Sequence, residues 1–278
     1  MIDCERVLEE SQRGKYYAIN INGKSTPLKA YPDIPNYGYH IDRQIFNSSL
    51  LTEAVNSGVE LIESSVNKLL TDSDHRIIGV KADNNHEYLA DYVFDASGMT
   101  RFSGRRLKLK ESYFSKEFIV STGMVDFPGK KKEEFEFYPR EKGWSWQIYA
   151  DDGLLTWTSL FLKSDFILEP PVSLRSYNNT GKISAQNMTW RKFNKTALPG
   201  LIILGDAACV IDPASGQGVH TAVLSAVRAV NTLQKILLSK EDEGALLRSY
   251  EKWFHTYFMA KCTELKAYYK LLGIKFFD

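Results

Sequence analysis

The sequence predicts a mixed α/β (α+β) fold: an incomplete Rossmann-like domain, an inserted antiparallel sheet and C-terminal helices. Strand and helix patterns alternate between glycine turns over residues 1–108. Apolar and polar residues then alternate with a period of two from about Glu111 to Lys163, which is typical of antiparallel strands. A short apolar run at 201–204 leads into a long helical pattern. The expected domains are therefore 1–108 with 197–278, and 109–196.

The first part of the chain has clear turn and helix signals. Residues 1–14 are expected to be the end of a helix, and Asn22-Gly23 between two alternating runs (15–21 and 25–30) predicts a hairpin. Pro32 and Pro35 predict an irregular entry to a helix that carries Arg43 and ends at Ser57-Gly58. Short strands are expected at 59–62, 66–70 and 77–82, and residues 87–89 lead to a further strand at 92–95.

The second part is expected to begin with the inserted sheet. Its strands are predicted at 118–120, 134–138, 144–149 and 154–162, whereas 164–190 shows no clear period. Helices are predicted over 219–238 and 243–272. The wide aromatic stripe of the last helix is expected to pack into a core.

Composition excludes several classes of protein. The chain has 278 residues, 44% of them hydrophobic and 25% charged, as in soluble globular proteins. A net charge of +1 gives no basis for binding nucleic acid or a membrane surface. The run Lys130–Lys132 is followed by two glutamates, which indicates a solvated hairpin tip.

Cysteine and histidine usage limits the chemistry further. The three cysteines lack paired spacing, which argues for a reducing compartment, and Cys209 is expected to be an apolar filler. No signal peptide and no apolar run long enough to span a bilayer is present, so a cytoplasmic location is expected. The histidines have no metal-ligand spacing, so no metal site is predicted, and no hydrolase nucleophile motif is found.

The most informative segment is the apolar strand 201–204 and the turn that follows it. Gly205, Ala207 and Ala208 have little or no side chain, which would let a ligand approach the backbone. Asp206 offers a carboxylate that can accept hydrogen bonds from the ribityl hydroxyls of a flavin. The alternative is an ordinary strand–helix corner in which Asp206 is only a cap. The full pattern favours a flavin.

The continuation of this turn strengthens that interpretation. Pro213 sets the chain direction before the helix. Gly216, Gln217, Gly218 and Val219 then place backbone N–H groups at a helix N-terminus. Reduced flavin is negatively charged on its pyrimidine side, which such a terminus suits. These residues are therefore predicted to bind the cofactor.

At these residues the chain resembles the superfamily that contains FAD-dependent aromatic monooxygenases, geranylgeranyl-reductase-like enzymes and flavin-dependent halogenases. The segment Tyr39–Phe46 resembles the helix whose arginine, here Arg43, lies near the FAD. The segment Val93–Gly98, followed by Arg101, resembles the second strand–turn that passes the dinucleotide. The resemblance spans about residues 38–235 and implies FAD as cofactor, with Asp95 and Gly98 near it.

One expected part of that superfamily is not found in the sequence. Its members open with a strand and a Gly-x-Gly-x-x-Gly turn that binds the pyrophosphate. Here the early glycines are isolated. The first βαβ unit is therefore expected to be missing. Either the chain is truncated or mis-started, or the natural protein lacks the ADP-binding half or takes it from another polypeptide. In both cases the affinity for FAD should be weaker than is usual for the superfamily.

These patterns predict an FAD-dependent oxidoreductase, monooxygenase-like, that acts on a small aromatic or apolar molecule through reduced flavin and O2. Reducing equivalents would come from a flavin reductase or NAD(P)H. The substrate is expected to lie against Trp144, Trp146 and Trp157 of the antiparallel sheet. The simpler alternative is that Trp144 and Trp146, two residues apart, share a face and pack a core. His220, a third catalytic candidate, would face either the flavin or the solvent.

Two other functions stay open. The segment Gly143–Ile148 is similar to the Gly-Trp-x-Trp-x-Ile-Pro signature of halogenases, with Tyr149 in place of the proline. Against halogenase, the Asp-Pro-Ala-Ser-Gly-Gln-Gly turn favours monooxygenases and reductases, and no lysine can be assigned the catalytic role that halogenases require. The third function is a non-catalytic relative that acts as a binding or accessory module.

Overall fold

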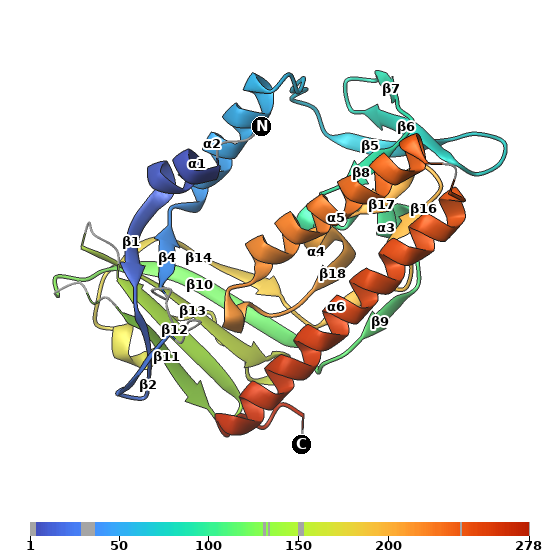
Figure 1. Cartoon of the computed structure of the whole chain (residues 1–278). Helices are drawn as coiled ribbons and strands as arrows, with labels where there is room; N and C mark the ends of the chain where they lie inside the picture. Colours follow the sequence, from blue (N-terminus) through green and yellow to red (C-terminus); the bar gives the residue numbers. More distant parts are fainter. Residues whose placement is uncertain are drawn as a thin grey trace. The chain divides into compact units, whose positions relative to one another are not determined.

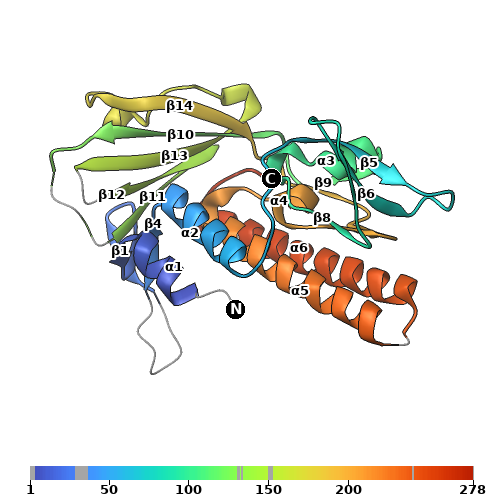
Figure 2. The same ribbon diagram turned by 90° about the horizontal axis from the view of Figure 1, so that it is seen from above.

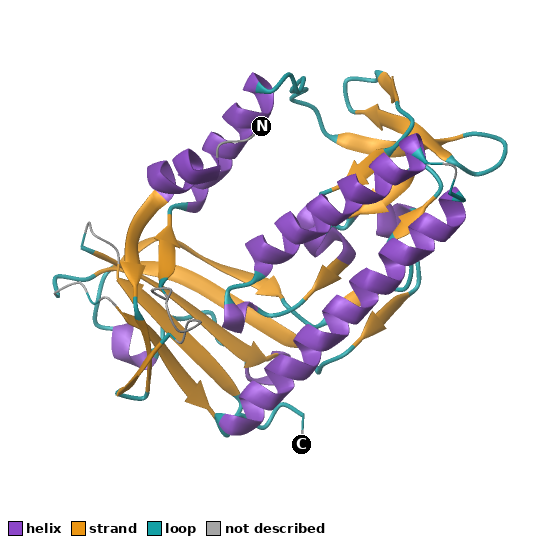
Figure 3. Ribbon diagram, in the orientation of Figure 1, coloured by secondary structure: helices purple, strands orange, loops and turns teal. Residues whose placement is uncertain are grey.

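The computed structural model describes residues 4–28, 37–129, 132, 134–149, 153–239 and 241–277. It has the predicted mixed α/β character (Figures 1 and 3). The chain forms two compact units. The first unit comprises Met1–Ile62, Ile119–Asn187 and Leu272–Phe276, and the second comprises Glu63–Phe118, Met188–Leu271 and Phe277–Asp278.

These units divide the chain differently from the expected domains. Residues of the N-terminal segment group with the antiparallel sheet because β2 (Ala18–Ile21) pairs in parallel with β11 (Glu134–Arg140). Conversely, β9 (Glu111–Tyr113) and β15 (Arg191–Phe193) pair with each other in the second unit, although both lie in the segment 109–196. Pairing between strands that are far apart in the sequence decides which residues share a unit. Local sequence patterns do not predict such pairing.

The first unit is built on a seven-stranded sheet with the order β14-β10-β13-β12-β11-β2-β3. The strands β10, β13 and β14 run side by side in both views (Figures 1 and 2). Every strand predicted between 118 and 162 is present, and the segment without a clear period contributes β14. The strands not yet given are β3 (Lys24–Pro27), β10 (Phe118–Asp126), β12 (Gly143–Tyr149), β13 (Leu154–Leu162) and β14 (Asn179–Asn187).

The predicted hairpin around Asn22-Gly23 is confirmed. The strands β2 and β3 are antiparallel, and both turn residues have positive φ, 50° and 86°, as a two-residue hairpin turn requires. The expected single strand 15–21 is divided, because β1 (Gln12–Tyr16) pairs instead with β4 (Gly38–Ile41). Pro32, Pro35, Lys130 and Lys131 lie outside the described residues.

Two helices complete the first unit. The helix α1 (Cys4–Ser11) is shorter than expected, and α2 (Arg43–Asn56) has the predicted bounds. Asp42 caps α2, because its side chain accepts hydrogen bonds from the N–H groups of the second and third helical residues, at 2.9 and 3.1 Å. The short 3₁₀ turns η2 (Lys163–Asp165) and η3 (Val172–Leu174) follow β13.

The second unit contains three small sheets, with the orders β5-β6-β7, β16-β17-β8 and β18-β15-β9. Just before this unit begins, at the end of the N-terminal segment of the first unit, the strand expected at 59–62 is absent. Its apolar side chains are exposed, and no strand pairs with it among the described residues. The remaining strands are β5 (Val66–Thr71), β6 (Ile77–Ala82), β7 (Glu87–Leu89), β8 (Val93–Asp95), β16 (Ala197–Leu198), β17 (Leu201–Ile203) and β18 (Cys209–Val210).

Helices α5 (Gly218–Leu238) and α6 (Glu243–Leu271) lie side by side in both views (Figures 1 and 2). Most of the aromatic stripe of α6 is buried, as predicted, while Trp253 and Tyr257 are partly buried. The residues that α5 buries are small ones, Ser225, Ala229 and Thr232. The shorter helical turns are η1 (Gly98–Thr100), α3 (Phe102–Arg106), α4 (Gly205–Ala208) and η4 (Pro213–Ser215).

Two kinds of feature are absent from the described residues: a membrane-spanning helix and a cluster of metal-binding side chains. None of the helices there combines the length and the apolar character that a membrane span requires. The same residues hold no group of three or more His, Cys, Asp or Glu side chains placed to bind a metal ion.

Candidate functional site

The structure brings two of the predicted cofactor segments together in the second unit. The strands β8 and β17 are parallel neighbours, and the N–H of Leu204 donates to the carbonyl of Asp95 at 2.9 Å. Because parallel strands end at the same edge of a sheet, the turns at Gly98 and Gly205 emerge side by side. The helical turns that follow, η1 and α4, are in contact. This edge, with the turn that leads to α5, is called the corner below.

Asp95 holds one turn of the corner in shape. One carboxylate oxygen accepts the N–H of Ser97 at 2.9 Å, and the other accepts the N–H of Ser103 at 2.7 Å. The residue is buried. Gly98 follows with a φ of +60°, and no atom lies within 4 Å of where a Cβ would stand. The carboxylate of Asp95 therefore positions the turn, and Gly98 is its open point.

The small residues after β17 are explained by packing within the protein. Gly205 has a φ of +49°, and its Cβ would stand 3.2 Å from the Cβ of Ala222 on α5. Its N–H donates to the hydroxyl of Ser225 at 3.0 Å. Ala207 and Ala208 are completely buried. Their small size thus serves the close approach of α4 to α5, and their role beside the cofactor stays a prediction. Asp206 lies partly buried in the first turn of α4.

A substitution separates the two explanations. We expect Gly205→Ala to lower the free energy of unfolding by about 2–3 kcal/mol, because the left-handed backbone and the contact with α5 both oppose a Cβ. Gly216→Ala should lower the free energy of unfolding only by the cost of a left-handed backbone at alanine, since the space around this residue is open. Urea denaturation of both variants checks this. Equal losses would contradict the packing explanation for Gly205.

The side of the corner toward the N-terminus of α5 is open. Gly216 (φ +64°) and Gly218 are exposed, and a Cβ at either would meet nothing within 4 Å. The first N–H groups of α5 have no partner within the helix. The side-chain oxygen of Gln217 is buried and has no hydrogen-bond partner among the described residues, while Val219 is partly buried. Room, donors and an unsatisfied polar atom together fit a bound flavin.

Asp212 is a residue of the corner that local patterns do not single out. It is buried, begins η4, and accepts hydrogen bonds from Trp190 and Tyr269, which are 22 and 57 residues away in sequence. Only its helix-capping position before Pro213 is visible in the sequence. The long-range partners show that it also ties the turn to α6.

The histidine candidate lies at the edge of the corner. The side chain of His220 is exposed, and its Nδ1 is 3.3 Å from the hydroxyl of Tyr257 on α6. The neighbouring Thr221 hydroxyl is 3.0 Å from the same oxygen. His220 is therefore held between solvent and α6.

The two arginines of the superfamily pattern have different environments. Arg43 is the exposed first residue of α2, in the first unit. Arg101, in the second unit, is buried, forms an ion pair with Glu111 and lies 4.0 Å from the ring centroid of Phe193. Burial, with a smaller contribution from Arg191 nearby, lowers the pKa of Arg101 to about 10. Arg101 is thus part of the core of its unit.

The three tryptophans expected at the substrate do not share a face of the sheet. Residues directly opposite each other on paired strands point to the same side. Trp146 pairs with Thr158, whereas Trp157 pairs with Gln147, so the side of Trp157 is opposite to that of Trp144 and Trp146. This corrects the expected grouping. On their side, Trp144 is buried and Trp146 is partly buried, and they lie 5.5 Å from the rings of Phe137 and Phe135 respectively.

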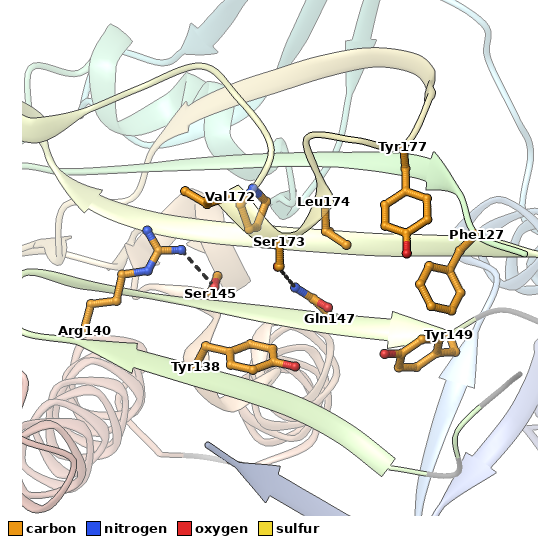
Figure 4. A pocket seen from close by; sticks show the side chains of 11 residues that line it. Phe127, Tyr138, Arg140, Ser145, Gln147, Tyr149, Val172, Ser173, Leu174 and Tyr177 are labelled. Carbon is orange, nitrogen blue, oxygen red and sulfur yellow. Dashed lines mark hydrogen bonds between the residues drawn. The ribbon is translucent and has the colours of Figure 1, made fainter. Parts of the chain in front are cut away.

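The other side of the sheet carries a groove of about 540 Å³ (Figure 4). Arg140 donates to the hydroxyl of Ser145 at 3.1 Å, and Gln147 donates to Ser173 at 3.3 Å. The groove is lined by Phe127, Tyr138, Arg140, Ser145, Gln147, Tyr149, Pro171, Val172, Ser173, Leu174 and Tyr177. It lies beside Trp157 and away from Trp144 and Trp146.

Comparison with known proteins places this arrangement in a family. The family described as Tryptophan halogenase matches residues 9–271. The chain belongs to the tryptophan halogenase family. This confirms the resemblance to the superfamily of FAD-dependent halogenases, monooxygenases and reductases.

Curated relatives come from both branches of the superfamily. The chain is 23% identical over 239 residues to digeranylgeranylglycerophospholipid reductase of Thermoplasma acidophilum, covering 77% of this chain and 59% of the relative. It is 21% identical over 268 residues to tryptophan 2-halogenase of Chondromyces crocatus, covering 85% and 51%. The chain thus spans between half and two thirds of the length of these relatives.

Solved structures show the fold. The halogenase BrvH from Brevundimonas sp. BAL3 superposes with a TM-score of 0.81 at 11% identity, over 99% of this chain and 69% of that one. The myxobacterial chondrochloren halogenase CndH gives a TM-score of 0.81 at 19% identity, over 95% and 69%. Both are described as flavin- or FAD-dependent, which supports FAD as the cofactor expected from the sequence.

Proposed function

We propose that this chain carries the flavin-binding corner and the substrate-side sheet of an FAD-dependent oxidoreductase. Its substrate is a small aromatic or apolar molecule, and it uses reduced flavin and O2. The observation that carries the proposal is the open N-terminus of α5 next to the paired turns of β8 and β17. Family membership and the flavin-dependent neighbours support it.

The residues of the corner would act on the cofactor by position and charge. FAD, when bound, supplies the redox chemistry. The N–H groups of Gly218 and Val219, at the positive end of the α5 dipole, would stabilise negative charge on the ring. The N–H of Gly216, predicted as a third donor, already donates to the carbonyl of Pro213 at 3.0 Å. Asp206 would accept hydrogen bonds from ribityl hydroxyls. Two hydrogen bonds support this role because they hold two turns of the corner: the N–H of Ser97 donates to Asp95, and the N–H of Gly205 donates to Ser225.

Halogenation is the second candidate, favoured by the family match and by the Gly143–Ile148 segment. The two reactions differ in what is added to the substrate. The protein would be incubated with FAD, a flavin reductase, NADH, O2 and a set of aromatic substrates, with or without bromide. Mass spectrometry would show bromine in the product for a halogenase and oxygen for a monooxygenase. Absence of any product and of substrate-dependent O2 uptake would favour a non-catalytic relative.

Binding of the flavin can be tested at Gly218. We expect Gly218→Leu to weaken FAD binding by about tenfold or more, because a side chain there fills the space beside the helix N-terminus. The fold should be unaffected, since this glycine has ordinary helical φ and open surroundings. Flavin fluorescence titration, extended to high FAD concentration, measures the affinity.

Gly218→Ala is the graded control and should weaken binding less than leucine. Gly181→Ala, at an exposed glycine of the first unit, should leave FAD affinity unchanged. If Gly218→Leu binds FAD as well as the unmodified protein does, the corner is not the flavin site.

A further inference from the structure

The carboxylate of Asp212 lies at the centre of a buried hydrogen-bond network in the second unit. One oxygen accepts the hydroxyl of Tyr269 at 2.5 Å and the N–H of Ala214 at 3.1 Å. The other oxygen accepts the indole N–H of Trp190 at 2.5 Å. The side chain is 2% exposed. One carboxylate therefore joins the turn, α6 and the segment before β15.

Among the described residues, the groups found in hydrogen bonds with the Asp212 carboxylate all donate to it. An ionised carboxylate satisfies all three, whereas a protonated one accepts poorly at the oxygen that carries the proton. Protonation therefore weakens either the bond to Trp190 or the bonds to Tyr269 and Ala214. Because the Ala214 bond caps η4, the geometry of the turn depends on the charge of this one group.

A change in the geometry of η4 affects the N-terminus of α5 because only a few residues separate the two. Gly216 caps the end of η4 by donating its N–H to the carbonyl of Pro213 at 3.0 Å, and its left-handed backbone leads directly to Gln217, the N-cap of α5. A shift of η4 therefore moves Gly216 and the N–H group of Gly218. The N–H of Gly218 is one of the groups that the proposed function assigns to the flavin.

We propose that Asp212 is a positioning residue for the flavin turn, and that the ionised carboxylate is the form that holds the turn ready to bind. The inference rests on the proposed function for the ligand, but its structural part concerns the protein alone. It adds to the corner a residue that touches neither cofactor nor substrate.

The surroundings of Asp212 place the pKa of its carboxyl group within the pH range in which the protein can be studied. Burial raises the pKa of Asp212 to about 6, against the hydrogen bonds from Tyr269, Ala214 and Trp190, which act in the opposite direction. The titratable groups that face it from α6 are the hydroxyl of Tyr269 and the thiol of Cys262, whose pKa is itself raised by burial.

Other charges nearby are engaged elsewhere. The ammonium group of Lys266 on α6 lies 4.8 Å from the ring centroid of Phe277. Arg191, next to Trp190 in sequence, pairs with Glu111 at 3.5 Å. The folded protein thus holds the Asp212 proton more tightly than the unfolded chain, so this group's contribution to stability falls as pH rises from about 4 to about 6.

The test uses NMR of the ligand-free protein between pH 4.5 and 8. We expect the indole N–H resonance of Trp190, assigned with Trp190→Phe, to titrate with an apparent pKa near 6. The amide resonances of Gly216 and Gly218 should follow the same curve. In Asp212→Asn the curve should be absent, whereas Asp126→Asn, at an exposed aspartate of the first unit, should leave it unchanged.

Tyr269→Phe gives a second variant that keeps the carboxylate. It removes one hydrogen bond to the charged form, so the apparent pKa of the Trp190 resonance should rise. Resonances of Trp190, Gly216 and Gly218 that stay constant over this pH range, or that titrate equally in Asp212→Asn, would overturn the proposal.

The consequence for binding is measured separately. The Kd for FAD should increase about fivefold or more from pH 7.5 to pH 5, and this dependence should be lost in Asp212→Asn. If FAD does not bind at any pH while the resonances still titrate, the proposed function fails and the positioning role of Asp212 in the turn stands. If FAD binds with the same pH dependence in both proteins, the positioning role fails.

Discussion

Replacing Glu111 with glutamine is expected to lower the free energy of unfolding by about 3–5 kcal/mol. Glu111 forms ion pairs with Arg101 and with Arg191. The side chain of Arg101 is 1% exposed, and two of its guanidinium nitrogens already lack a hydrogen-bond partner among the described residues. Glu111 supplies the carboxylate that pairs with Arg101 among the described residues, so its removal leaves the guanidinium of Arg101 as a buried charge without that partner. Urea denaturation measures the loss.

An exposed ion pair provides the control. Glu169→Gln removes the partner of Arg175, in a pair with both side chains about half exposed, and should cost no more than about 1 kcal/mol. The double variant Arg101→Met with Glu111→Leu should recover much of the stability lost in Glu111→Gln, because neither charge is then buried. If Glu111→Gln costs no more than Glu169→Gln, Arg101 is not a buried charge.

Replacing Trp157 with alanine is expected to cost about 3–5 kcal/mol. Its side chain is completely buried in a cluster with Val125, Leu155 and Leu174. Gly123 leaves room for it, because a Cβ there would stand 2.8 Å from the indole ring. The substitution therefore opens a cavity that the neighbouring strands cannot fill. Loss of unfolding free energy, measured in urea, reports its size.

Trp146→Ala is the matched control on the other side of the sheet. Trp146 is only partly buried, so its loss should cost less than that of Trp157. Trp157→Phe should be milder than Trp157→Ala, because it keeps most of the volume and removes an indole N–H that has no partner among the described residues. A larger loss in Trp146→Ala than in Trp157→Ala would contradict the deeper burial of Trp157.

Much of the local structure could be predicted because it depends on neighbouring residues. The helix beginning at Arg43 follows from its Asp42 cap, and the hairpin at Asn22-Gly23 follows from the positive φ that these residues tolerate. The prediction of a strand at 59–62 is wrong because a strand depends on a distant partner and not on neighbouring residues alone. An apolar run becomes a strand only where another strand pairs with it, and none does among the described residues.

The glycines of the corner show the same division within the site. Gly205 and Gly216 look alike in the sequence, which predicts that both lie beside the cofactor. In the structure the first is packed against Ala222, and the second borders open space. Asp212 could not be singled out, because its partners Trp190 and Tyr269 come from distant segments. Contacts between residues far apart in the sequence decide which small or charged residues pack within the protein and which border open space.

The sequence by itself determined the class of fold, the strand–turn–helix corner and its likeness to flavin enzymes, because turn chemistry and periodicity are local properties. The tertiary structure alone decided which residues share a unit and which way the tryptophans face. Strand register sets the face of a side chain, and a shift of one residue reverses it. Trp146 and Trp157 could therefore be separated only by their observed partners, Thr158 and Gln147.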